Sequence, residues 1–129
     1  MAVGSALAAA TWWPRPAPPP PDLIDARPNP IPPTPEVLAI GTRVYQTQCA
    51  SCHGEDGHGD GPQAASLKRR PVDFWVHFGS GHTHSDGRLF FWITDGMPGT
   101  EMPRFGDRLS ESERWSVIDF VKTFAPVDR

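Results

Sequence analysis

Long apolar runs, cysteines and an excess of charge of one sign are all scarce in this sequence of 129 residues. No stretch reaches the about 20 consecutive apolar residues that a membrane-spanning helix needs, so nothing in the sequence crosses a bilayer unaided. Two cysteines are too few for a disulfide-rich secreted scaffold. The formal net charge is −3, which argues against a protein that binds nucleic acid through a basic face.

Proline, in contrast, is abundant and concentrated near the start of the chain. Eleven of the 16 prolines lie between Pro14 and Pro35. Such a run favours an extended polyproline II conformation, which acts as a semi-rigid spacer. We therefore predict a proline-rich linker over residues 14–35. A ligand for an SH3-like domain is the alternative, although no other feature of the sequence supports it.

Residues 1–13 are apolar and contain neither Lys nor Arg. They are too short to cross a bilayer, and they lack the basic beginning of a secretory signal. The alanines at 8–10 nevertheless fit a cleavage site, and Trp12 and Trp13 suit a membrane interface. We predict a truncated signal or membrane anchor here, with a disordered terminus as the alternative.

The composition changes near Thr34, and we predict a folded domain over residues 36–129. Thr34 is suited to cap a helix that has Pro35 at its first position, where a missing N–H costs nothing. Apolar residues then recur at helical spacing as far as Tyr45. This first predicted helix ends at a pair of cysteines.

Two further helices are predicted in the second half of the chain. Ser85 or Asp86 is placed to cap the first of them. Ser110 begins the last helix, because Glu113 three residues later completes a capping box, and apolar residues follow at helical spacing over 117–124. No segment shows the pattern of a strand, so we predict an all-α fold.

The predicted helices are short and the loops between them are long. Loops of this kind, rich in glycine and proline, cover residues 54–62 and 97–108. A domain of this size buries little apolar surface with its own side chains, and long loops need something to organise them. The pattern therefore indicates a large apolar ligand at the centre of the domain.

The residues Cys49-Ala50-Ser51-Cys52-His53 form C-x-x-C-H, the attachment signature of c-type haem. Two thiols at this spacing reach two vinyl groups of one porphyrin, and the adjacent histidine points at the iron. A thioredoxin-like redox pair, a plain disulfide and a structural zinc site are the alternatives. The other histidines could add zinc ligands, but not at zinc-finger spacing; they are His58, His77, His82 and His84.

Methionine is the common second axial ligand of such a haem, and it raises the reduction potential. Met97 and Met102 both lie in the stretch G-M-P-G-T-E-M-P-R-F, and each precedes a proline that restricts its backbone. His82 and His84 are weaker alternatives, because they lie in a polar loop.

At this point the segment from about Pro35 to Phe124 resembles a bacterial monohaem class I cytochrome c domain. The resemblance implies a small fold of three to five short helices wrapped around one covalently bound haem c. It implies that His53 and Met102 ligate the iron, Met102 being the second methionine of the loop. It also implies that the carbonyl of Pro62 accepts a hydrogen bond from Nδ1–H of His53 and so fixes the ring.

The same resemblance implies a close contact between the first and last helices. Gly41 and Tyr45 match the pair that packs against an aromatic residue of the last helix, here Phe120 or Trp115. Trp92 and Phe105 line the haem edge or belong to the ordinary core. The cluster Lys68-Arg69-Arg70 faces a haem propionate, an acidic patch on a partner, or only solvent.

These residues predict one-electron transfer rather than catalysis, because a His/Met-ligated iron has no open position. We expect a tethered relay or a subunit of a respiratory or photosynthetic chain. Its redox partner would be an oxidase, a quinol-oxidising complex, a reaction centre or a dehydrogenase, with membrane association through the N-terminal tail. Covalent attachment of haem implies a periplasmic location or the outer face of the cytoplasmic membrane. A haem-based sensor or peroxidase with an open iron is the alternative function.

Overall fold

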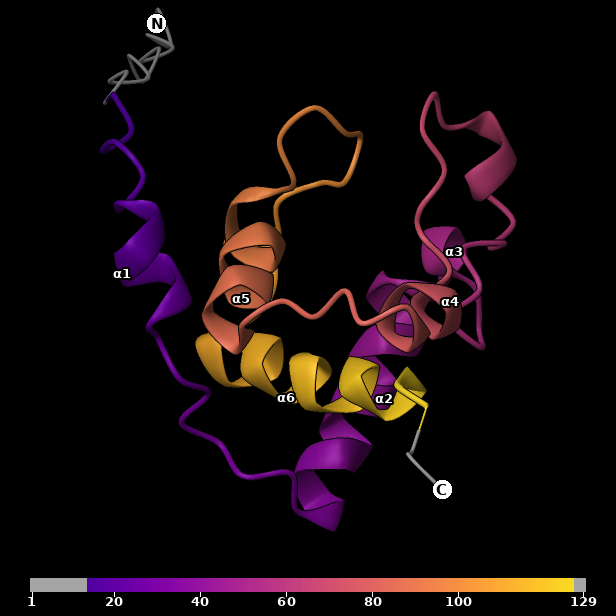
Figure 1. Ribbon diagram of the computed structural model, residues 1–129, viewed down its shortest axis with the longest axis horizontal. Helices are drawn as coiled ribbons and strands as arrows, with labels where there is room; N and C mark the ends of the chain where they lie inside the picture. Colours follow the sequence, from indigo (N-terminus) through magenta and orange to yellow (C-terminus); the bar gives the residue numbers. More distant parts are fainter. Residues whose placement is uncertain (1–13, 127–129) are drawn as a thin grey trace, which may run out of the picture.

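The computed structural model describes residues 14–126, so the signal or anchor predicted for residues 1–13 lies outside the described residues. Within the described part the chain is helical and contains no strand, which confirms the predicted all-α class. None of the described helices is long and apolar enough to span a membrane. The elements are α1 (Pro21–Asp25), α2 (Pro35–Gln48), α3 (Ala50–His53), η1 (Ala64–Ser66), α4 (Phe74–Gly79), α5 (Asp86–Asp95), α6 (Glu111–Val121) and η2 (Lys122–Phe124), where η marks a 3-10 turn (Figure 1).

The predicted helix starts are found at the residues that the sequence indicated. The hydroxyl of Thr34 accepts a hydrogen bond from the N–H of Val37 at the start of α2, with a distance of 3.3 Å. Ser85 caps α5 in the same way. Ser110 and Glu113 form the complete capping box of α6. Each cap satisfies N–H groups that the first turn of a helix leaves without partners.

Helices α2 and α6 cross in close contact at Gly41, which lies on α2. A Cβ atom at this position would collide with the backbone carbonyl of Ser116 on α6, so only glycine fits. One turn further along α2, the ring of Tyr45 packs against Phe120, with ring centroids 5.1 Å apart. Phe120 is therefore the aromatic partner of the first helix. Trp115 faces the other way and stacks on Phe90 of α5.

The core consists of two apolar clusters, and both depend on α6. The first lies between α2, α6 and the loops, with Val44, Tyr45, Ala50, Phe105, Leu109, Val117 and Phe124 buried in it. The second lies between α5 and α6 and contains Phe90, Trp115 and Ile118. Because α6 is covered from two sides, all of its residues from 115 to 119 are buried, rather than one stripe.

The proline-rich segment is not an extended spacer throughout, which corrects the prediction of polyproline II over the whole of residues 14–35. Asp22-Leu23-Ile24-Asp25 interrupts the prolines, and these residues form the short helix α1, which has Pro21 at its first position. Ile24 is only 7% exposed. A Cβ atom at Gly87 of α5 would collide with the carbonyl of Ile24, so the two backbones are in direct contact.

Residues 20–33, which we call the N-terminal strap, are also attached to the domain by polar contacts. Asp25 forms an ion pair with Arg88 of α5 at 2.8 Å. The side chain of Asn29 donates hydrogen bonds to Asp119 at 3.0 Å and to the carbonyl of Trp115 at 3.3 Å, both on α6. The N-terminal strap therefore runs beside α5 and α6 before the chain turns into α2, as the indigo and violet part of Figure 1 shows.

Candidate functional site

The two cysteines lie where the first long helix ends. Cys49 separates α2 from the four-residue helix α3, which carries Cys52 and ends at His53. Both cysteines are free thiols. Burial raises the pKa of Cys49 to about 12, with a smaller contribution from Cys52, so this thiol is protonated at neutral pH.

The glycine-rich loop after α3 folds back to hold this short helix in place. Backbone N–H groups of the loop donate to the carbonyls of α3, from Gly59 to His53 at 2.8 Å and from Gly61 to Cys52 at 3.1 Å. A Cβ atom at Gly61 would collide with the carbonyl of Ser51. Glycine is needed at position 61 because the loop backbone there lies directly against the backbone of α3.

Tyr45 ties the core to the residue that follows the predicted haem ligand. Its hydroxyl donates a hydrogen bond of 2.6 Å to the carbonyl of Gly54, and its side chain is almost fully buried. Burial raises the pKa of Tyr45 well above its usual range, so the hydroxyl keeps its proton. The C-terminus of α3, and with it His53, is therefore fixed to α2.

His53 lies in an apolar environment that keeps its ring neutral. Phe74 stacks on the ring, with centroids 5.0 Å apart and an angle of 9° between the planes. Burial lowers the pKa of His53 to about 4. The buried Nδ1 atom has no hydrogen-bond partner among the described residues, so the hydrogen bond expected from Nδ1–H to the carbonyl of Pro62 is not formed. Phe74 orients the ring in its place.

The two methionines occupy different positions in the loop between α5 and α6. Met102 packs against the first core cluster, which Cys49 also contacts. Met97 instead contributes to a turn, where its carbonyl accepts hydrogen bonds from the N–H of Thr100 at 3.2 Å and from the Thr100 hydroxyl at 2.7 Å. The N–H of Met102 in turn donates to that hydroxyl. Met102 is therefore the methionine of this loop that packs against the same cluster as Cys49.

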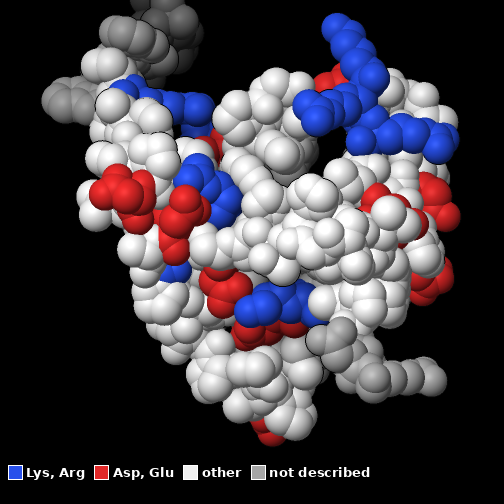
Figure 2. Space-filling view, viewed as in Figure 1, with Lys and Arg blue, Asp and Glu red and all other residues white. Residues whose placement is uncertain are grey.

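The loop that carries Met102 and the segment around η1 face each other on one side of the molecule. Figure 2 shows a hollow on this face between the loop that carries Met102 and the segment around η1, with Lys and Arg gathered beside it. The carboxylate of Glu101 accepts a hydrogen bond of 2.7 Å from the N–H of Lys68 and so connects the two loops. Lys68, Arg69 and Arg70 are all exposed.

The remaining histidines are not brought to the cysteines. His58 forms an ion pair with Asp73 at 2.9 Å. His82 and His84 gather instead with His77, between α4 and α5. Among the described residues no three or more His, Cys, Asp or Glu are placed to hold a metal ion together, so the zinc site considered as an alternative is not formed.

Comparison with known proteins decides the family. Residues 38–125 match the sequence model of the family described as cytochrome c, which is more than half of the chain. The chain belongs to the cytochrome c family. The match begins within α2 and ends just after η2, so it includes both cysteines, His53 and both methionines of the loop between α5 and α6.

Solved structures agree with this result. A chain of the reducing HAO-like protein complex of Kuenenia stuttgartiensis (Kustc0457/Kustc0458) is similar to 75% of this cytochrome, with 30% identity and a TM-score of 0.65. This cytochrome spans 47% of that longer chain. The c-type cytochrome KustC0563 is similar over 67% of this chain and 98% of its own, with 27% identity and a TM-score of 0.55. Comparison with the curated proteins gives no match.

Members of this family carry a covalently bound c-type haem, and the residues present fit that group. Two free thiols are available for thioether bonds, and His53 offers a buried neutral imidazole, the form that binds a metal. The unpartnered Nδ1 atom of His53 is unusual, because buried polar atoms are nearly always hydrogen-bonded. Stacking on Phe74 fixes the ring, and its neutral form leaves a nitrogen lone pair for a metal.

Sequence reasoning did not identify two of the residues that build the site, or one of its hydrogen bonds. Phe74 lies in a segment with weak periodicity, and nothing in the sequence indicates that it stacks on His53. Glu101 reads as an ordinary loop residue. The hydrogen bond from Tyr45 to Gly54 connects positions nine residues apart, and only the break between α2 and α3 brings them together.

Proposed function

We propose that this chain transfers single electrons through one haem c, with Cys49 and Cys52 as the attachment residues and His53 and Met102 as the axial ligands. Haem-based electron transfer follows from membership of the cytochrome c family. The assignment of the ligands is supported by one observation above all: Cys49 and Met102, which are far apart in the sequence, pack against the same apolar cluster.

The bound haem supplies one-electron chemistry, since its iron alternates between the ferrous and ferric states. The chain's own residues hold and tune it. With His53 and Met102 both as ligands, the iron would have no position open to a substrate, so the proposed pair favours electron exchange over substrate binding. Tyr45, Phe74 and the loop that follows α3 keep His53 in position. The apolar cluster excludes water from this region.

We further propose that the chain works as a tethered relay or as a subunit of an electron-transport complex, outside the cytoplasmic membrane. The proline-rich segment supports a tether, although part of it packs on the domain as the N-terminal strap. The similarity to a chain of an HAO-like complex supports work beside a partner protein. That partner would be an oxidase, a quinol-oxidising complex, a reaction centre or a dehydrogenase.

The optical spectrum of the protein, produced with a c-type maturation system, tests the central proposal. Sharp reduced bands from covalently bound haem, together with the weak far-red band of Met–iron ligation, are expected. A high-spin spectrum would contradict the His/Met assignment and would favour a sensor or peroxidase with an open iron. Failure to attach haem would leave the cysteines to disulfide or redox chemistry.

The proposed location has its own test. Fractionation of cells that express the full reading frame should place the haem-stained protein in the periplasm or with the membrane. Recovery of the haem-loaded protein in the cytoplasmic fraction would refute the proposed location.

A further inference from the structure

Three histidines lie close together outside the haem-binding region, between α4 and α5. His77 is in the last turn of α4, and His84 comes directly before the residue that caps α5. The Nε2 atoms of His77 and His84 are 3.2 Å apart. Neither ring has a role in holding the haem in the arrangement described above, so their convergence needs an explanation of its own.

Both rings are held by the elements that flank them. The ring of His84 packs edge to face against Trp92 of α5, with centroids 4.8 Å apart and an angle of 76°. The ring of His77 contacts Phe78 beside it on α4, at 5.9 Å between centroids. The two helices therefore position the facing nitrogens, and little side-chain ordering remains to be done when a ligand binds.

We propose that His77 and His84 bind a divalent transition-metal ion of the zinc and copper class through their Nε2 atoms. Imidazole nitrogen suits Zn²⁺, Cu²⁺ and Ni²⁺. Two nitrogens that each lie about 2.0–2.1 Å from a tetrahedral zinc ion are roughly 3.3 Å from one another. The observed separation of 3.2 Å between the two Nε2 atoms matches this requirement.

The surroundings of His84 leave its ring available as a ligand. Burial lowers the pKa of His84, with further lowering by His77, His82 and Arg88 against an opposing effect of Asp25, so the neutral form is favoured. A neutral imidazole is the form that binds metals. Arg88 is the nearest cation, and its charge is balanced by Asp25, which it meets with hydrogen bonds of 2.8 and 2.9 Å.

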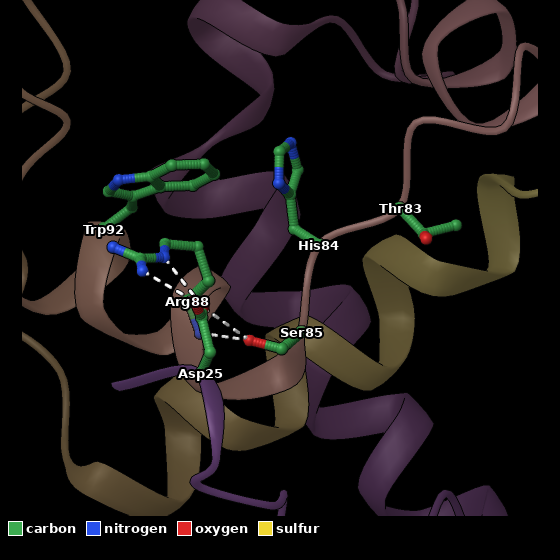
Figure 3. A pocket seen from close by; sticks show the side chains of 6 residues that line it. All are labelled: Asp25, Thr83, His84, Ser85, Arg88 and Trp92. Carbon is green, nitrogen blue, oxygen red and sulfur yellow. Dashed lines mark hydrogen bonds and ion pairs between the residues drawn. The ribbon is translucent and has the colours of Figure 1, made fainter. Parts of the chain in front are cut away.

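The other groups beside the pair are already engaged. Figure 3 shows His84 at the edge of a cavity of about 320 Å³, with the Asp25 carboxylate turned to Arg88 and Ser85 and away from the His84 ring. His82 has its Nδ1 atom 2.9 Å from the hydroxyl of Ser80. No third protein ligand is placed to join the pair within residues 14–126. The ion would therefore have two protein ligands, and water would complete its coordination.

Metal binding to the tag-free, haem-loaded protein tests the proposal. Zn²⁺ is titrated by calorimetry in the presence of a weak competing chelator, and Cu²⁺ is examined by electron paramagnetic resonance. We expect one equivalent of each ion, with a Cu²⁺ spectrum that shows two nitrogen ligands. His77→Gln and His84→Gln should each weaken binding by at least roughly 10–100-fold. Removing a residue that only hydrogen-bonds a metal ligand already costs that much, and these variants remove the ligand itself.

Two variants serve as matched controls. His58→Gln removes an exposed histidine that pairs with Asp73, and it should leave binding unchanged. His82→Gln removes the third histidine of the cluster and should change the affinity only slightly. The haem spectrum of every variant reports whether the fold is kept. If His77→Gln and His84→Gln bind the ion as tightly as the unchanged protein, or if His58→Gln loses as much affinity as they do, the site is overturned. A large loss in His82→Gln would overturn its two-ligand composition.

Discussion

The ring of Phe74 lies flat against the ring of His53, with centroids 5.0 Å apart and planes inclined by only 9°. The same phenylalanine continues into a stack with Phe78 and Phe124. An imidazole with an unpartnered Nδ1 atom has no hydrogen bond to orient it, so this stack supplies the orientation. The aromatic residues of α4 therefore belong to the support of the haem-binding site.

Replacing Phe74 with Leu tests this support. Leucine keeps most of the apolar volume but loses the flat face, and aromatic pairs contribute about 0.5–1.5 kcal/mol beyond the area that they bury. We expect the free energy of unfolding, measured with denaturant, to fall by about 1–2 kcal/mol, near the average for a destabilising substitution. Val76→Ala on the same helix is the control, because Val76 is 68% exposed and should have little effect. Equal effects of the two variants would contradict the role given to Phe74.

The choice between the two methionines predicts opposite results for two similar variants. Met102→Ala removes the thioether that packs against the same cluster as Cys49, so we expect loss of the far-red band, a high-spin component and a lower reduction potential. Met97→Ala should leave the spectrum unchanged, because only its carbonyl is engaged in the turn. Spectroscopy and redox titration of both variants decide the matter, and the reverse pattern would assign the ligand to Met97.

The hydrogen bond from Tyr45 to Gly54 predicts the effect of removing one oxygen atom. Tyr45→Phe leaves the Gly54 carbonyl buried without its partner, which costs roughly 1–3 kcal/mol of unfolding free energy. Thr47→Val on the same helix removes a hydroxyl whose acceptor carbonyl, that of Arg43, is at an exposed position, so it should change stability by less than about 0.5 kcal/mol. Thermal and denaturant unfolding measure both. A neutral Tyr45→Phe would show that the bond does not hold α3 in place.

Gly87 predicts an unusual sensitivity on α5. Alanine normally stabilises a helix by about 1 kcal/mol relative to glycine. At Gly87, however, the added Cβ atom would meet the carbonyl of Arg27 at 2.7 Å and would collide with that of Ile24, so the N-terminal strap must move away. We expect Gly87→Ala to be destabilising and to make the strap cleavable by protease. Gly79→Ala on α4 is the control, since its nearest contact is an ordinary 3.4 Å; protection of the strap in Gly87→Ala would refute the docking.

The ion pair of His58 and Asp73 predicts a pH dependence with two limits. The hydrogen bond with Asp73 raises the pKa of His58 above 6.5, helped by Asp60 and Asp56, and lowers the pKa of Asp73 below 3.8. The contribution of His58 to the free energy of unfolding is complete below the ordinary histidine pKa, and it is lost as the pH rises through the raised pKa. That of Asp73 is complete above the ordinary carboxyl pKa and is lost as the pH falls through the lowered value.

The stabilisation from this pair is therefore greatest between about pH 4 and 6.5, the range between the two ordinary pKa values. Nuclear magnetic resonance titration of the reduced protein should give a midpoint for His58 above 6.5. In Asp73→Asn the midpoint should move down toward the ordinary value. An unchanged midpoint in that variant would show that the pair does not form in solution.

Local signals in the sequence predicted the starts of the helices well. They predicted the buried residues of α6 less well, because this helix is covered on two sides. The caps at Thr34, Ser85 and Ser110 depend on side chains that bond the backbone within three residues, so composition alone shows them. The apolar spacing over residues 117–124 indicated one buried stripe of α6. The structure buries Ser116 and Asp119 as well, because α2 and α5 with the N-terminal strap cover different sides of the helix.

Long-range contacts account for what the sequence did not show. The motif from Cys49 to His53 can be recognised without the tertiary structure, because the spacing of its cysteines and histidine is itself the attachment signature of c-type haem. The packing of Met102 and Cys49 against one cluster depends on the folded loops. Phe74, which stacks on His53, lies in a helix of only six residues, too short for a periodic signal. The N-terminal strap was missed for a related reason, since only a few residues within a proline-rich run attach it to the domain, among them Ile24, Asp25 and Asn29.

The close contact of Ile24 with Gly87 also has a mechanical consequence. Any force that pulls on the chain ahead of Pro14 reaches α5 through the N-terminal strap, where the buried Ile24 and the ion pair of Asp25 with Arg88 resist it sideways. Helix α5 leads directly into the loop that carries Met102, and that loop folds back on it through a hydrogen bond from Phe105 to Ile93. Strain that enters through Ile24 and Asp25 therefore acts on the helix next to the loop of Met102, the proposed second ligand, rather than on α3, which carries His53.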